Sequence, residues 1–108
     1  MTALASVEAN DVADTRFVRV RGEVDLSNAF AVSEVIGSAV RADASTIVVD
    51  LSETTYLDSS GISMLFRLAQ RLSYSRQELL LVVPVGSPVR KVLEITNVQQ
   101  VIPLLERW

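Results

Sequence analysis

The sequence predicts a single α/β domain, residues 1–108, with helices packed against a mixed, mainly parallel sheet of four or five strands. Short apolar segments alternate along the chain with longer segments of helical periodicity, an order typical of α/β folds. The length fits one domain, since domains commonly contain about 100–150 residues. The composition, 49% hydrophobic with four glycines and three prolines, excludes collagen-like and disordered chains.

The first half of the chain is predicted to begin with two strands and a helix. Residues 15–21 alternate arginine with apolar side chains, which indicates a strand with one buried face. Within the N-terminal segment, residues 1–14, we expect one further strand over residues 3–8. Gly22 and Asp25 indicate a turn, and Ser27 is a suitable N-cap for a helix that ends near Arg41.

The remaining elements complete a domain core predicted over residues 15–105. The β-branched segment 46–51 is typical of a central strand covered on both faces, and 79–83 resembles it. Between them, Asp58 and Ser59 can cap a second helix. This helix has an apolar stripe at Ile62, Leu65, Phe66, Ala69 and Leu72.

The C-terminal part is predicted to contain a third helix and an edge strand. Ser87 followed by Pro88 is a strong helix start, and Asn97 is a plausible end for that helix. The last extended segment, 101–105, contains Pro103, which cannot donate to a strand ladder. We therefore expect this strand at the edge of the sheet.

The residue types that the sequence lacks exclude several kinds of chemistry. It contains no cysteine and no histidine, so disulfides, zinc fingers, thiol catalysis and Ser-His-Asp triads are ruled out. We predict no metal site and no cofactor, and a regulatory or binding domain is favoured over an enzyme. The net charge of −3 argues against direct nucleic-acid binding. Without a long apolar run or a signal-peptide pattern, we expect a cytoplasmic protein that does not insert into membranes.

The charges are distributed unevenly along the chain. Residues 23–58 carry seven acidic side chains and one basic one, Arg41. Chance accumulation of acids in loops and helix starts explains this adequately. The alternative is an acidic surface near Asp25 and Asp58 that meets a basic partner. Charge alone favours the first explanation.

Two segments are candidate sites, because ligands of parallel sheets bind where strands lead into helices. They are residues 22–25, with Glu23 and Asp25, and residues 57–62, with Asp58, Ser59, Ser60 and Gly61. The Ser59 hydroxyl at a helix start would accommodate a phosphate well. Gly61 would leave room for another molecule. Taken alone, however, these aspartates and serines are ordinary capping and turn residues, and Asp50 is either a strand-end carboxylate or a partner of the Asp58 loop.

Together, four motifs resemble the STAS domain family, in particular the bacterial anti-anti-sigma factors. In this sequence they are Gly-Glu-Val-Asp (22–25), Ile-Val-Val-Asp-Leu (47–51), Asp-Ser-Ser-Gly-Ile (58–62) and Ser-Pro-Val-Arg-Lys-Val-Leu (87–93). Their order and spacing match from about residue 15 to residue 105. Asp-Ser-Ser-Gly alone would be weak evidence, but the combination is specific.

The resemblance implies a regulatory partner switch. An anti-sigma factor antagonist of this type binds, when unphosphorylated, an anti-sigma factor that is an ATP-binding serine kinase, and a sigma factor is released for transcription. The kinase phosphorylates the serine after the aspartate, here Ser59, which ends the interaction until a serine phosphatase restores it. The same positions imply partner contacts at Asp25, Asp58, Ser60 and Gly61, with Glu23 beside them. We expect a monomer or a weak homodimer.

The sequence departs from the family pattern in three places. No glycine occurs in residues 74–78, Ser63 stands where glycine is common, and the C-terminal helix seen in many members is missing, which would expose Trp108. Two other functions stay open. One is a STAS subunit of a lipid or anion transport complex. The other is a receiver-type phosphoprotein that accepts phosphate on an aspartate. Such a protein would need an acidic pocket with a lysine near a later strand, and Lys91 is the only lysine, so this function is disfavoured.

Overall fold

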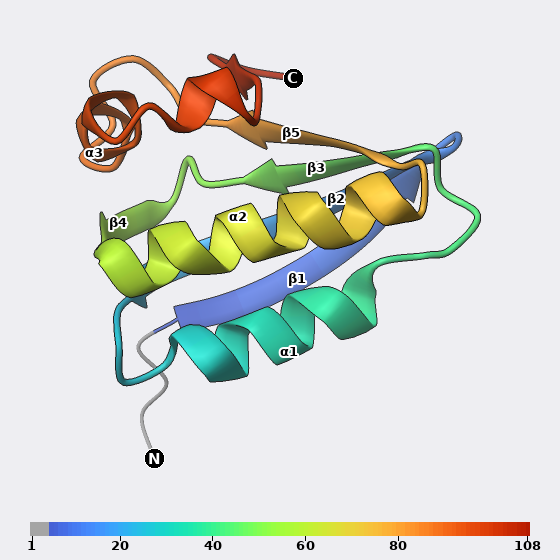
Figure 1. The fold of residues 1–108 in the computed structure, drawn as a ribbon, viewed down its shortest axis with the longest axis horizontal. Coiled ribbons are helices and arrows are strands. Elements are labelled where there is room, and N and C mark those ends of the chain that lie inside the picture. Colours follow the sequence, from blue (N-terminus) through green and yellow to red (C-terminus); the bar gives the residue numbers. More distant parts are fainter. Residues whose placement is uncertain (1–4) are drawn as a thin grey trace.

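The computed structural model describes residues 5–108, and these residues form six strands and three α-helices (Figure 1). In chain order they are β1 (Ala5–Val12), β2 (Thr15–Val24), α1 (Ala29–Ala39), β3 (Thr46–Asp50), β4 (Thr54–Leu57), α2 (Ser59–Tyr74), β5 (Glu78–Val82), α3 (Arg90–Ile95) and β6 (Leu104–Leu105). A 3₁₀ turn, Val98–Gln100, precedes β6. Of the strand expected over residues 3–8, residues 3 and 4 lie outside the described part, and the strand extends further, to Val12.

The sheet has the order β1-β2-β3-β5-β6, with β4 paired to β2 beyond the end of β3. The β1–β2 pair is antiparallel and all the others are parallel, which confirms the predicted mixed, mainly parallel sheet. The number of strands, however, is six rather than four or five. The additional strand is β4, whose buried Thr54 donates a hydrogen bond from its hydroxyl to the Val20 carbonyl (2.7 Å).

Strand β2 continues past Gly22, where the sequence predicted a turn. Gly22 adopts a φ of 95°, and the register between β2 and β4 shifts between Gly22 and Glu23. Glycine adopts such a φ without the steric cost that other residues meet, so the strand passes through an irregularity and continues to Val24. The turn begins only at Asp25, three residues later, which carries the end of β2 up to β4 and the start of α2.

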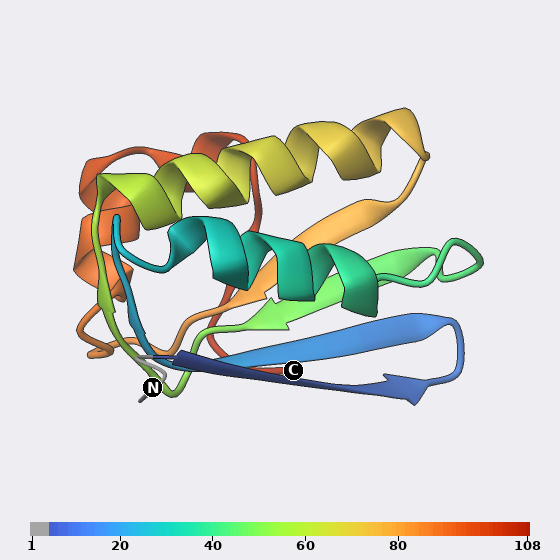
Figure 2. The ribbon, with the colours of Figure 1, turned by 90° about the horizontal axis from the view of Figure 1, so that it is seen from below.

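Helices α1 and α2 lie side by side on one face of the sheet (Figure 2). The predicted apolar stripe of α2 forms part of the core, with Ile62, Leu65 and Leu72 buried and Phe66 and Ala69 partly buried. As expected of a strand covered on both faces, Ile47, Val48 and Val49 of β3 are fully buried. Both helices therefore pack against the core through their buried side chains. Their N-terminal ends lie at the same end of the molecule (Figure 1).

Two predicted helix starts are wrong, by one residue for α1 and by two residues for α3. The N-cap position of α1 is Asn28 rather than Ser27, because the turn after β2 includes Ser27. Helix α3 begins at Arg90, since residues 85–89 form turns in which the Ser87 Oγ accepts only from the Val89 N–H (3.3 Å).

The ends of the C-terminal elements agree better with the sequence. Asn97, left-handed with a φ of 60°, follows the end of α3 as expected. Strand β6 is an edge strand, as Pro103 predicts, but only two residues long. The turn that begins at Val98 continues into the predicted strand, because the N–H groups of Val101 and Ile102 donate to the Val98 carbonyl. After β6 the described chain continues to Trp108 without a helix, and the Trp108 ring meets Phe17 edge-on, 5.3 Å between ring centroids.

A cluster of charges joins the β1–β2 hairpin to the segment after α1. Arg41 donates to Asp43 and lies 2.8 Å from the Asp11 carboxylate, which also accepts from Arg16. Desolvation alone would raise the pKa of Asp11, but the hydrogen bonds from Arg41 and Arg16 outweigh it and lower that pKa. The hydrogen bond from Arg41 likewise lowers the pKa of Asp43.

Candidate functional site

Helix α2 begins with Asp58 as its N-cap, as the sequence predicted. The Asp58 Oδ1 accepts hydrogen bonds from the backbone N–H groups of Ser60 (2.9 Å) and Gly61 (3.2 Å). The first turn of a helix leaves its N–H groups without partners, and a negative side chain there also interacts favourably with the helix dipole. Asp58 is therefore a structural residue of α2 whatever its role toward a partner.

The second oxygen of the same carboxylate binds a different loop. The Asp58 Oδ2 accepts from the backbone N–H of Leu26 (3.1 Å), while the Asp58 N–H donates to the Val24 carbonyl (3.3 Å). The two candidate segments, one after β2 and one at the start of α2, are thus joined by hydrogen bonds. Figure 1 shows the β2–α1 connection and the start of α2 at the same end of the molecule.

Ser59 is the first residue of α2 and is exposed. Its hydroxyl makes no hydrogen bond with the residues that the structure describes, because Asp58 already serves as the cap. Ser60, the next residue, is half-buried. Of the two serines of the motif, Ser59 has the more accessible hydroxyl.

Asp25 closes the turn between β2 and α1. Its Oδ1 accepts from both the backbone N–H and the hydroxyl of Ser27 (2.9 and 2.5 Å), and its side chain is half-buried. Its Oδ2 accepts no hydrogen bond from the described residues. Glu23 is exposed, and its carbonyl accepts from the Asn28 side chain (2.8 Å). Asp25 thus keeps one carboxylate oxygen without a hydrogen bond from the described residues, and the side chain of Glu23 is exposed.

Gly61 faces the core of this protein. A Cβ at this position would lie 2.3 Å from the Leu57 Cδ1 and 3.3 Å from the Val24 Cγ1, and Leu57 is itself buried. The close approach that glycine permits is therefore made by the protein's own β4 and β2, and the space expected for another molecule is filled from within. A contact between Gly61 and a partner stays a prediction.

Two large apolar residues beside this site were not predicted from the sequence. Leu26 is 82% exposed and Phe30 is 76% exposed. With Ala29 they line one side of a shallow groove of about 290 Å³, which Ser60, Ser63 and Arg67 of α2 complete. The exposure of Phe30 could have been inferred from the sequence, because Phe30 lies outside the helical spacing of the buried Ala29, Val32 and Ile36. Leu26 lay in a predicted turn, where exposure is unremarkable.

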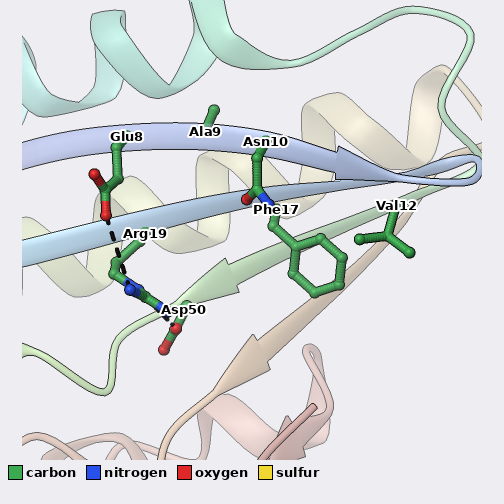
Figure 3. Close-up of a pocket in the computed structure, with 7 residues that line it drawn as sticks. All are labelled: Glu8, Ala9, Asn10, Val12, Phe17, Arg19 and Asp50. Atoms are coloured by element: carbon green, nitrogen blue, oxygen red, sulfur yellow. Dashed lines mark hydrogen bonds and ion pairs between the residues drawn. The ribbon is translucent and has the colours of Figure 1, made fainter.

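Asp50 does not join the Asp58 loop. Its Oδ2 accepts from the Arg19 Nε (3.1 Å) and its Oδ1 from the Ser52 N–H (2.9 Å), so it is a strand-end carboxylate. Arg19 also pairs with Glu8, on the sheet face turned away from α2 (Figure 3). These three residues line a second depression of about 430 Å³ with Ala9, Asn10, Val12 and Phe17. None of the residues predicted to contact a partner lines it.

Among residues 5–108, no group of three or more acidic residues is arranged to hold a metal ion. Within the same range, the helices are too short or too polar to cross a membrane.

Comparisons with known proteins agree on one family. The chain matches the model of the STAS domain over residues 6–107. The anti-sigma-F factor antagonist RsfB of Mycobacterium tuberculosis is 34% identical to it over 56 residues, which make up 52% of this chain and 46% of that protein. The matched segment thus spans about half the length of this relative.

Solved structures share the fold. The crystal structure of an anti-sigma factor antagonist from Mycobacterium paratuberculosis has a TM-score of 0.82 and 25% identity, covering 94% of this chain and 85% of that one. SpoIIAA in its unphosphorylated form has a TM-score of 0.71 at 22% identity, covering 92% and 87% of the two chains. The phosphorylated form of the Bacillus SpoIIAA gives 0.65 at 20%, covering 92% and 90%.

Proposed function

This chain belongs to the STAS domain family, and from that premise we propose that it is an anti-sigma factor antagonist controlled by phosphorylation of Ser59. In its unphosphorylated state it binds an anti-sigma factor that is a serine kinase, and the sigma factor held by that kinase is released. The kinase binds the ATP, and a separate serine phosphatase reverses the modification. The chain itself has no catalytic role in this scheme and acts in the cytoplasm through its surface.

The observation that carries the proposal is that Asp58, and not Ser59, caps helix α2. Asp58 satisfies the N–H groups of the first turn of α2, which leaves the exposed Ser59 hydroxyl without a structural task. A kinase can modify a hydroxyl of this kind without first breaking the fold. Ser60 is half-buried, and it is the less suitable acceptor.

The electrostatics of the site account both for retention of the fold and for loss of partner binding when Ser59 is phosphorylated. A phosphoserine adds roughly −1.5 to −2 charges at neutral pH. On the protein's own side, the partial positive charge at the N-terminus of the 16-residue α2 offsets part of the cost. On the partner's side, the phosphate adds bulk and charge to a surface that already carries Asp25, Asp58 and Glu23. Binding is lost and the fold is kept.

The test uses the full chain and the purified anti-sigma factors encoded by its source organism. Each is mixed with the chain and Mg-ATP, and phosphate is located by mass spectrometry. Binding of the unmodified and modified chains is then compared by titration calorimetry. We expect one kinase to add one phosphate to Ser59 and the modified chain to bind at least tenfold more weakly. A Ser75→Ala variant is the matched control and should be modified normally, because Ser75 is an exposed serine at the other end of α2.

Three results would contradict the proposal. Absence of binding to every anti-sigma factor would exclude the antagonist function. Acid-labile phosphate on an aspartate would favour the aspartyl phosphoprotein. Capture of the chain by a membrane transport complex, with no anti-sigma factor bound, would favour the transport subunit.

A further inference from the structure

An apolar groove lies between the N-terminal halves of α1 and α2. Leu26 and Phe30, one helical turn apart in sequence, form its apolar side with Ala29, and Ser60, Ser63 and Arg67 form its polar side. Figure 1 shows that the two helices run next to each other along this line. The groove is continuous with the phosphorylation site proposed above, because Ser60 directly follows Ser59.

The apolar side of the groove is exposed and held in position. Leu26 and Phe30 are among the most exposed large hydrophobic residues of the described chain. Two such side chains next to each other are typical of an interaction surface, and large anchors of this kind supply much of the binding energy at interfaces. The backbone of Leu26 is fixed by its hydrogen bond to the Asp58 carboxylate, so little order has to be gained on binding.

The polar side of the groove favours a negatively charged group. Arg67 is exposed and takes part in no ion pair with the described residues, whereas Arg19, Arg21 and Arg41 are each paired with carboxylates. A guanidinium can bind a carboxylate through two parallel hydrogen bonds. The Ser60 and Ser63 side chains line the same side and add donors.

We propose that this groove binds a segment of the anti-sigma factor that inserts an apolar side chain between Leu26 and Phe30 and directs a carboxylate to Arg67. The inference rests on the proposed function and adds the chemistry of the partner's contact segment. It also gives the switch a second cause. A phosphate on Ser59 would lie at the end of the groove and repel the partner's carboxylate, in addition to blocking contact sterically.

The test measures binding of variants to the anti-sigma factor that binds the unaltered chain. Phe30→Ser and Leu26→Ser are each expected to weaken binding at least tenfold, at both low and high salt. Tyr74→Ser is the matched control, because Tyr74 is 80% exposed at the other end of α2. These side chains are exposed, so melting temperatures should be nearly unchanged, and any variant that melts early is excluded from the comparison.

A second pair of variants tests the charge. Arg67→Gln is expected to weaken binding severalfold at about 50 mM salt and to matter less at about 500 mM, where screening is stronger. Arg76→Asn is its control, because Arg76 is exposed, lies beyond the end of α2 and has a φ of 57°, which asparagine tolerates. A photo-crosslinking phenylalanine analogue at position 30 should capture a partner peptide that contains an aspartate or glutamate.

The outcomes separate this inference from the function on which it rests. If the unaltered chain binds no anti-sigma factor, the proposed function fails and the inference fails with it. If it binds and the Leu26 and Phe30 variants bind equally well, only the inference is overturned. The inference is also overturned if Phe30→Ser abolishes self-association of the chain, measured by light scattering, without changing partner binding, since a second copy would then occupy the groove. Crosslinks to partner peptides without an acidic residue overturn the assignment of Arg67.

Discussion

Replacement of Asp58 should destabilise the domain more than any other single change at the site. Its carboxylate accepts three backbone hydrogen bonds, from Ser60, Gly61 and Leu26. Loss of an N-cap side chain costs about 0.5–2 kcal/mol. A hydrogen bond to a charged group contributes about 1.5–3 kcal/mol, and the low end applies to the exposed Leu26 contact. We therefore expect Asp58→Ala to lower the free energy of unfolding by about 2–4 kcal/mol.

Asp58→Asn separates the two functions of this carboxylate. The amide oxygen can still accept from Ser60 and Gly61, but the amide nitrogen would face the Leu26 N–H, where both groups are donors. The cost should be roughly half that of alanine, because only the cap is retained. Asp43→Ala is the control, since the Asp43 side chain is 76% exposed and pairs only with Arg41; surface ion pairs contribute about 0–1 kcal/mol.

Thermal and urea denaturation of the unaltered chain and the three variants measure these differences. For a domain of this size, 1 kcal/mol corresponds to a melting-temperature shift of roughly 4–8 °C, so Asp58→Ala should melt about 10 °C or more below the unaltered chain. The reasoning is refuted if Asp58→Ala costs no more than Asp43→Ala. It is also refuted if the asparagine and alanine variants are equally stable.

Four further predictions concern the site and the opposite end of the molecule. Ser59→Ala should keep partner binding and escape phosphorylation, whereas Ser59→Glu should bind more weakly; equal affinities in calorimetry would exclude the switch. Gly61→Ala should lower the melting temperature, because overpacking against Leu57 costs about 1–3 kcal/mol and outweighs a gain in helix propensity of about 1 kcal/mol; a stabilised variant would contradict this. Asp25→Asn keeps the oxygen that accepts from the loop, so stability should hold while partner binding or phosphorylation falls; an earlier melt with unaltered binding would make Asp25 purely structural. The lowered pKa values of Asp11 and Asp43 beside Arg41 stabilise the fold above the unfolded pKa of about 3.9, and this contribution is lost as the pH falls through the folded values, so Arg41→Gln should be destabilising at neutral pH and progressively less so as the pH falls below about 3.9; a difference in melting temperature that does not depend on pH would contradict it.

The elements that the sequence predicted best are those whose signal is local. Strand β3 is a β-branched run, and α2 combines a strong cap with a regular apolar stripe. In both cases the pattern reports directly on burial, and burial decides the structure. The Asp58 cap could be predicted for the same reason, since its first two partners lie within three residues of it.

The features that could not be predicted depend on contacts distant in sequence. Thr54–Leu57 has only four residues and becomes a strand because β2 has a free edge where β3 ends. The Leu26 bond to Asp58 spans 32 positions and has no sequence pattern. The absence of glycine in residues 74–78 also has an answer that only the structure supplies, because Arg76 itself takes the left-handed conformation, with a φ of 57°.

The same long-range bond would allow the proposed binding surface to stay rigid while Ser59, the proposed phosphorylation site, is modified. Because Asp58 holds both the first turn of α2 and the loop that carries Leu26, the position of that loop does not depend on the Ser59 hydroxyl. A phosphate on Ser59 therefore changes the charge of the surface without releasing the elements that form it. If Ser59 were itself the cap, its modification would remove a hydrogen bond that orders the helix start, and the loss of partner binding would be coupled to a loss of stability. The geometry thus separates the free energy of partner binding from the free energy of unfolding. We therefore expect the phosphorylated and unphosphorylated chains to have nearly equal melting temperatures.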